Sequence, residues 1–211
     1  MKIKAIVFDF DGTLADSFSH AVDVSNLMAQ RLKRPAIVAT KELRGKSIFE
    51  VLKQLQISRW FIFWHKRAFL RAYKDGFKGV PTFLHLRRVL GSLHKQFTVG
   101  VVSSNDKELV QSFLLRHKMD MIDFVYTNRS LFGKEYLIKK MLRSQHLESG
   151  EILYVGDEIR DVEACKKIGV KVISVSWGFN LKKSLLACNQ GMVVDTPEQM
   201  YTLILKITER K

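Results

Sequence analysis

The sequence predicts an α/β fold in which helices cover both faces of a parallel sheet and an all-helical segment is inserted after the first strand. Two observations predict this fold class. Short apolar, β-branched runs alternate with amphipathic helical patterns over most of the 211 residues, and such alternation is typical of parallel sheets. Between about residues 15 and 80, by contrast, helical patterns follow one another without a clear strand.

Four apolar runs are expected to form the main strands of the sheet. The first run, Ile3–Phe8, is rich in β-branched residues and ends shortly before Asp11-Gly12, a dipeptide that favours a turn. The other three runs are Thr98–Val102, Ile152–Val155 and Val170–Val175. Two shorter runs, Phe124–Tyr126 and Met192–Val194, predict edge strands.

The segments between these strands show helical periodicity. Apolar residues recur on one face of Lys107–His117, Lys134–His146 and Glu158–Ile168. We expect Asn105 and Glu108 to form a capping box at the start of the first of these helices. Gly169 is expected to end the third helix as a C-cap.

The predicted domains follow from where the alternation stops. Residues 1–14 and 81–211 are expected to form a Rossmann-like three-layer core, and residues 15–80 an all-helical cap. Within the cap, amphipathic patterns cover residues 17–32, 47–55 and 58–73. Gly76, Gly79 and Pro81 mark the return of the chain to the core.

The charge of the chain is strongly positive. The net charge is +14, and residues 15–80 alone carry 13 Lys/Arg against 5 Asp/Glu. Such a balance attracts small anionic molecules or nucleic acid. The sequence contains no helix-turn-helix, zinc-finger or aromatic RNA-binding signature, so we favour a small anionic ligand. With two cysteines and no apolar run of about 20 residues, a cytoplasmic protein without a membrane span is expected.

Polar residues gather where the predicted strands end. Each has a simple structural explanation on its own, such as a turn, a helix cap or a solvated lysine. Together they lie at the carboxyl edge of a parallel sheet, which is where ligands bind in open α/β folds. The residues are Asp9, Asp11, Ser103, Ser104, Lys134, Asp157 and Asp161.

These residues resemble the four motifs of the haloacid dehalogenase-like hydrolase superfamily. Asp9-Phe10-Asp11-Gly12-Thr13 matches the first motif, and the run from Gly156 to Asp161 matches the fourth. Ser103 and Lys134 stand at the second and third motifs, which are weak by themselves. The helical insertion is similar in position to the type 1 cap of the phosphoglycolate phosphatase-like branch, and the resemblance covers nearly the whole chain.

The resemblance implies a Mg²⁺-dependent phosphatase that hydrolyses a small phosphate monoester, such as phosphoglycolate or a sugar phosphate, through an aspartyl-phosphate. Asp9 is then the nucleophile and Asp11 the acid/base group. Mg²⁺ is expected on the Asp9 carboxylate, the Asp11 backbone carbonyl and the Asp157 carboxylate. The implied phosphate-binding groups are Ser103, Ser104 and Lys134, with Asp161 and Glu158 in supporting positions.

Other functions remain open at this point. A sugar phosphomutase would use the same aspartates and pass the phosphoryl group to a sugar instead of water. A polynucleotide phosphatase or a basic nucleic-acid-binding module would use the positive cap. Arg44 and Lys46 are candidates for binding a second anionic group of the substrate, although a solvated basic turn is the explanation that we favour for them. The oligomeric state is not predicted.

Overall fold

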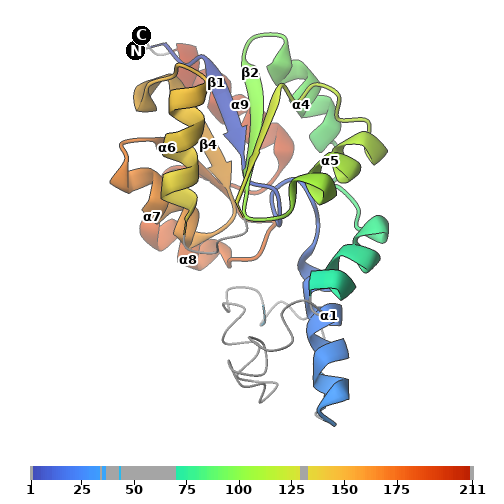
Figure 1. Ribbon diagram of the computed structural model, residues 1–211. Helices are drawn as coiled ribbons and strands as arrows, with labels where there is room; N and C mark the ends of the chain where they lie inside the picture. Colours follow the sequence, from blue (N-terminus) through green and yellow to red (C-terminus); the bar gives the residue numbers. More distant parts are fainter. Residues whose placement is uncertain (1, 34, 37–42, 44–69, 129–132, 210–211) are drawn as a thin grey trace.

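The computed structural model describes residues 2–33, 35–36, 43, 70–128 and 133–209 (Figure 1). The described strands form one parallel sheet in the order β3-β2-β1-β4-β5-β6. They are β1 Ala5–Phe8, β2 Thr98–Ser103, β3 Phe124–Thr127, β4 Ile152–Gly156, β5 Lys171–Val175 and β6 Val193–Val194. The four predicted main strands and both edge strands are therefore confirmed.

The first strand lies in the middle of the sheet. Ala5 is paired with Thr98 of β2 on one side and with Ile152 of β4 on the other. All four residues of β1 are buried, as expected for a strand covered on both faces. The residues that follow β1 are thus flanked by those that follow β2 and β4.

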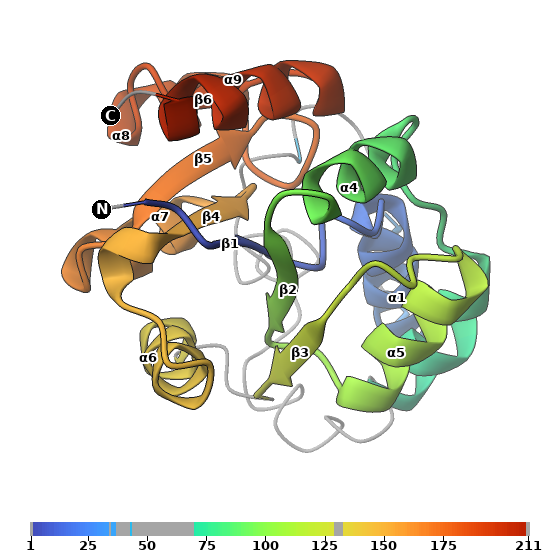
Figure 2. The same cartoon turned by 90° about the horizontal axis from the view of Figure 1, so that it is seen from above.

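Helices form the two outer layers of the core (Figure 2). One face of the sheet packs against α4 Leu86–His94, α5 Lys107–Arg116 and α9 Pro197–Glu209. The other face packs against α6 Lys134–Ser144 and α7 Ile159–Lys167. Helix α8 Lys182–Cys188 lies beside α7. Two short 3₁₀ helices are η2 Phe77–Gly79 and η3 Ser149–Glu151.

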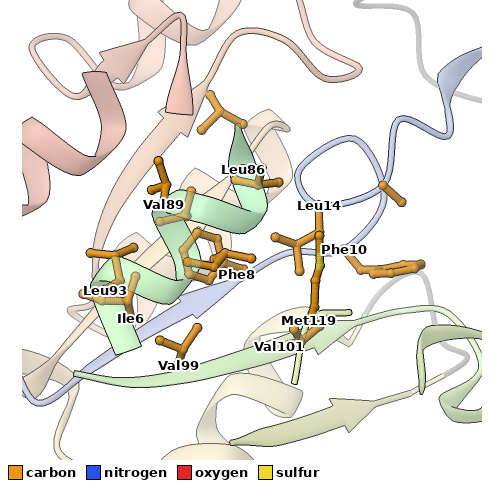
Figure 3. Packing of buried hydrophobic residues seen from close by; sticks show 14 of the residues in the cluster. Ile6, Phe8, Phe10, Leu14, Leu86, Val89, Leu93, Val99, Val101 and Met119 are labelled. Carbon is orange, nitrogen blue, oxygen red and sulfur yellow. The ribbon is translucent and has the colours of Figure 1, made fainter. Parts of the chain in front are cut away.

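Alternate residues of each strand supply the two hydrophobic layers. In β1, Ile6 and Phe8 face α4, whereas Ala5 and Val7 face α6 and α7. Figure 3 shows Ile6 and Phe8 among side chains of α4 and β2. The predicted three-layer α/β core is confirmed.

The chain leaves the core after β1 and returns to it beside the point of departure. The Asp16 amide donates a hydrogen bond to the Pro81 carbonyl at 2.9 Å, and Ala15 forms a β-bridge with Thr82. Between these two points, α1 Phe18–Arg31 extends away from the sheet (Figure 1), and residues 70–76 are helical. The helix expected over residues 47–55 and most of that over 58–73 lie outside the described residues.

Helix ends were predicted with mixed success. The capping box of Asn105 and Glu108 is wrong, because Asp106 is the N-cap of α5 and the Asn105 side chain contacts Asp11. Gly169 is confirmed as the residue that ends α7, with φ +71° and the hydrogen bond from Val170 N–H to Cys165 C=O that this cap requires. Helices α4, α8 and α9 were not predicted.

Candidate active site

The predicted polar residues meet at the carboxyl edge of the sheet. Asp9 follows β1, Ser103 ends β2 and Asp157 follows β4. Lys134 is the first residue of α6, and Asp161 lies in the first turn of α7. Because β1 is hydrogen-bonded to both β2 and β4, the topology brings these positions together at one point of the edge.

Lys134 connects two of the acidic side chains. Its Nζ donates to Asp9 Oδ2 at 2.6 Å and also donates to Asp161 Oδ1. The side chains of Lys134, Asp9 and Asp161 are 8%, 4% and 0% exposed, so little water screens these ion pairs. The other oxygen of the nucleophile candidate, Asp9 Oδ1, accepts the Phe10 amide at 2.8 Å.

Asp157 is held rigidly by the loops around it. Its Oδ1 accepts the Thr13 hydroxyl at 2.7 Å, and its Oδ2 accepts the Phe179 amide at 2.7 Å. A Cβ atom added to Gly12 or to Gly178 would lie 2.2 Å from Asp157 Oδ2. Only glycine at both positions allows the backbone to approach this carboxylate so closely.

The start of α7 places its acidic residues in different roles. Asp161 is buried, and its Oδ2 accepts the Glu158 amide at 3.1 Å, so it closes the first turn while it holds Lys134. The Glu158 carboxylate accepts Arg160 Nη2 at 2.6 Å. The supporting roles expected for Asp161 and Glu158 stay predictions.

The buried carboxyl groups of the site are only partly neutralised by the Lys134 cation, and the pKa values of Asp9 and Asp157 are raised. Burial raises the pKa of the Asp9 carboxyl to about 7, although the charge of Lys134 opposes this shift. Burial likewise raises the pKa of Asp157 well above its usual range, and the charges of Glu158 and Asp9 add to the effect. Burial alone would lower the pKa of Lys134, but the charges of Asp161 and Asp9 raise it above its usual value. A cation bound here would favour the ionised carboxylates.

Three carboxylates form a group that suits a hard divalent cation. One oxygen from each of Asp9, Asp157 and Asp161 lies within 4.8 Å of the others, and all three residues are buried. Oxygen donors of this kind are what Mg²⁺ prefers. Asp161 joins the predicted ligands Asp9 and Asp157 in this group. The Asp11 side chain is not part of it, and the Asp11 backbone carbonyl stays a predicted ligand of the metal.

The Asp11 carboxylate accepts hydrogen bonds from segments far apart in the sequence. Ser17 Oγ and Tyr73 OH donate to its Oδ1 at 2.9 and 2.8 Å, and Asn105 Nδ2 donates to its Oδ2 at 3.1 Å. Burial raises the pKa of the Tyr73 phenol well above its usual value, and the Asp11 charge adds to this, so the phenol stays a donor.

The loop after β2 faces the same site. Ser103 is buried, and its Oγ accepts the Asn105 amide at 3.0 Å. Ser104 is half-buried in the bend that follows. Both candidate phosphate-binding residues therefore precede the asparagine that contacts Asp11.

Several contacts at the site were not predicted from the sequence. Thr13 belongs to the quoted motif, but its bond to Asp157 follows only from the fold. Tyr73, Ser17 and Phe179 carry no local signal for their contacts. Trp177 adds a further contact, because its Nε1 donates to the Thr13 carbonyl at 3.3 Å. The cap candidates Arg44 and Lys46 lie outside the described residues.

The family assignment rests on a match over most of the chain. Residues 6–175 match the model of the family described as haloacid dehalogenase-like hydrolase. The chain belongs to this family. The aspartates of the site, Ser103 and Lys134 fall inside the matched range, and the resemblance inferred from the motifs is confirmed.

Relatives of this haloacid dehalogenase-like hydrolase agree in length and in fold. A curated protein from Synechococcus elongatus, named phosphoglycolate phosphatase, is 26% identical over 97% of this chain and 99% of its own. A haloacid dehalogenase-like hydrolase structure from Streptococcus pneumoniae has a TM-score of 0.83 at 20% identity, over 96% of this chain and 98% of that one. The crystal structure of a predicted phosphoglycolate phosphatase from Haemophilus somnus has a TM-score of 0.80 at 20% identity, over 99% of both chains.

These findings confirm the predicted class of enzyme. The chain is a hydrolase of the phosphatase type within the haloacid dehalogenase-like family. Among the helices that the structure describes, none has the length and apolar character needed to cross a bilayer.

Proposed function

We propose that this hydrolase is a Mg²⁺-dependent phosphatase that forms an aspartyl-phosphate on Asp9. The arrangement that carries the proposal is the buried Asp9 carboxylate, which shares Lys134 with Asp161 and lies beside Asp157. A carboxylate attacking an anionic phosphate faces like-charge repulsion, and Lys134 offsets part of it. Bound Mg²⁺ would supply further positive charge and polarise a phosphoryl oxygen.

We propose the following roles for the residues of the site. Asp9 attacks phosphorus, and an acyl phosphate forms as the ester P–O bond breaks. Asp11 gives a proton to the leaving oxygen and later takes one from the attacking water. Ser103, the amide that follows it and Lys134 stabilise the phosphoryl oxygens. Asp9, the Asp11 carbonyl and Asp157 would hold Mg²⁺, with Asp161 orienting Lys134.

The substrate that we propose is a small phosphate monoester, with phosphoglycolate as the first candidate. Its support is the name of the relative that matches 97% of the chain. We propose further that residues 15–80 act as the cap that selects the substrate. The net positive charge of this segment suits a ligand with a second anionic group.

Turnover of p-nitrophenyl phosphate with and without Mg²⁺ tests the proposal, alongside Asp9→Asn. We expect hydrolysis that requires Mg²⁺ and is lost in Asp9→Asn. A panel of phosphate esters that includes phosphoglycolate then ranks the substrates. Absence of turnover with every ester, in folded protein, would contradict the proposal and favour a phosphomutase or a nucleic-acid-binding module.

A further inference from the structure

The carboxylate of Asp11 has only part of its hydrogen-bonding capacity free. An ionised carboxylate offers about four lone-pair positions, two on each oxygen. The hydroxyls of Ser17 and Tyr73 fill both positions on Oδ1. Asn105 Nδ2 fills one position on Oδ2, which leaves Oδ2 with room for a proton.

The Ser17 hydroxyl forms a hydrogen bond with the Asp11 carboxylate and does not cap its own helix. It occupies the N-cap position of α1, where serine normally accepts an amide from the first turn. Within the described chain its hydroxyl is directed to Asp11 and makes no such capping bond. Ser17 is fully buried, so its hydroxyl has no access to bulk water as an alternative partner.

Tyr73 is held in place from two sides. The His20 ring donates from Nε2 to the Tyr73 carbonyl at 2.8 Å, and its centroid lies 4.7 Å from that of the phenol ring. On another side, the centroid of the Phe77 ring lies 5.4 Å from that of Tyr73. The Phe77 ring also stacks on the Phe10 ring, with the two centroids 5.7 Å apart. Phe10 stands between Asp9 and Asp11 in the chain, so this packing fixes the phenol relative to both aspartates.

The Oδ2 atom of Asp11 lies on the side of the phosphate-binding loop. Asn105, which contacts Oδ2, comes two residues after Ser103, and its amide is bonded to Ser103 Oγ. Oδ1 is directed instead toward Ser17 and Tyr73, which lie near the two ends of residues 15–80. The two oxygens of one carboxylate are therefore inequivalent.

We propose that Tyr73 is a positioning residue for Asp11: with Ser17 it saturates Oδ1, so that Oδ2 carries the transferred proton. This inference rests on the proposed function of Asp11. In the first step the proton passes from Oδ2 to the leaving oxygen while the Asp9–phosphorus bond forms and the ester bond breaks. In the second step Asp11 takes a proton from water as water displaces the Asp9 carboxylate from phosphorus.

The test compares esters whose leaving groups differ in their need for a proton. p-Nitrophenoxide is weakly basic and leaves without much help, whereas an alkoxide requires protonation. The parameter kcat/KM reports the steps up to ester cleavage and not the later hydrolysis of the acyl phosphate. We compare p-nitrophenyl phosphate with the alkyl phosphate that the wild-type enzyme hydrolyses best.

We expect Tyr73→Phe to lower kcat/KM for the alkyl ester by about tenfold, equivalent to about 1.4 kcal/mol, and for p-nitrophenyl phosphate by less than about twofold. Ser17→Ala removes the other donor to Oδ1 and should give the same selectivity. Tyr201→Phe removes a phenol hydroxyl from α9, on a half-buried side chain packed against the core, and should change neither value.

Equal losses for both esters, or no loss for either, would overturn the inference. If Tyr73→Phe does not fold, as judged by its melting curve, the selectivity of Ser17→Ala decides the question in the same way. Failure of the proposed function is seen separately, in the wild type and in Asp9→Asn. Wild-type protein inactive on both esters, or full activity in Asp9→Asn, would overturn the proposed function and this inference together.

Discussion

Lys134→Met should destabilise the metal-free protein strongly and in a pH-dependent way. The substitution keeps the aliphatic length but removes the cation between Asp9 and Asp161, whose side chains are 4% and 0% exposed. Removing one partner of a buried ion pair costs about 3–5 kcal/mol, because the remaining charge stays buried and uncompensated. We expect a loss of this size in the free energy of unfolding at pH 8.

The pH dependence follows from Asp9. Its folded-state pKa of about 7 is above the unfolded value, so ionisation of Asp9 destabilises the folded state as pH rises from about 4 to about 7. Because the Lys134 charge lowers this pKa, the variant's pKa is higher and its penalty continues to grow above pH 7. The cost of Lys134→Met should therefore be about 1 kcal/mol larger at pH 8 than at pH 6.

Urea unfolding in the presence of a chelator, at both pH values, measures this cost. Lys139→Met is the matched control, because Lys139 is half exposed and pairs with Glu135 one turn away on the surface of α6. We expect the control to match the wild type within error. A loss below about 1 kcal/mol at pH 8, or a larger loss at pH 6 than at pH 8, would refute the reasoning.

Three further predictions concern the neighbours of Asp157 and the metal. Gly178→Ala places a Cβ 2.2 Å from Asp157 Oδ2 and should weaken Mg²⁺ binding by more than about tenfold in calorimetry. Gly79→Ala is the control, because a Cβ there meets nothing within 4 Å, and it should leave Mg²⁺ binding unchanged. Thr13→Val removes a buried donor to Asp157 and should lower the free energy of unfolding by about 1–3 kcal/mol in urea titrations; a neutral result would contradict this. Since Asp9 must lose a proton, and the raised pKa of Asp157 can add a second one, apparent Mg²⁺ affinity should rise by at least about tenfold per pH unit below pH 7; a pH-independent affinity would argue against Asp9 as a ligand.

The sheet was predictable because its strands are buried on both faces. Apolar runs such as Ile3–Phe8 and Ile152–Val155 contrast sharply with the polar residues around them. Helix α4 was missed because its start carries no capping signal: its N-cap is His85 in a left-handed conformation. Helix α9 does carry a signal, a proline at its first position, but one proline by itself does not distinguish a helix start from a turn.

The acidic part of the site was predictable because its residues fall in short motifs. The distance along the chain from Asp9 to Asp11, and from Asp157 to Asp161, is a few residues, so local sequence identifies them. The partners of Asp11 were not predictable, because Tyr73 and Asn105 lie 62 and 94 residues away from it in sequence. Asn105 was mistaken for a helix cap because its local context suits one, and only the tertiary fold directs its side chain to Asp11.

The central claim is that Asp9 becomes phosphorylated during turnover, and mass spectrometry of acid-quenched enzyme tests it most directly. The protein is mixed with p-nitrophenyl phosphate and Mg²⁺, quenched within the first turnovers and digested. We predict one phosphoryl group on the peptide that contains Asp9, released by hydroxylamine as expected for an acyl phosphate, and absent in Asp9→Asn. Sustained turnover without this adduct, together with unimpaired activity of Asp9→Asn, would contradict the account.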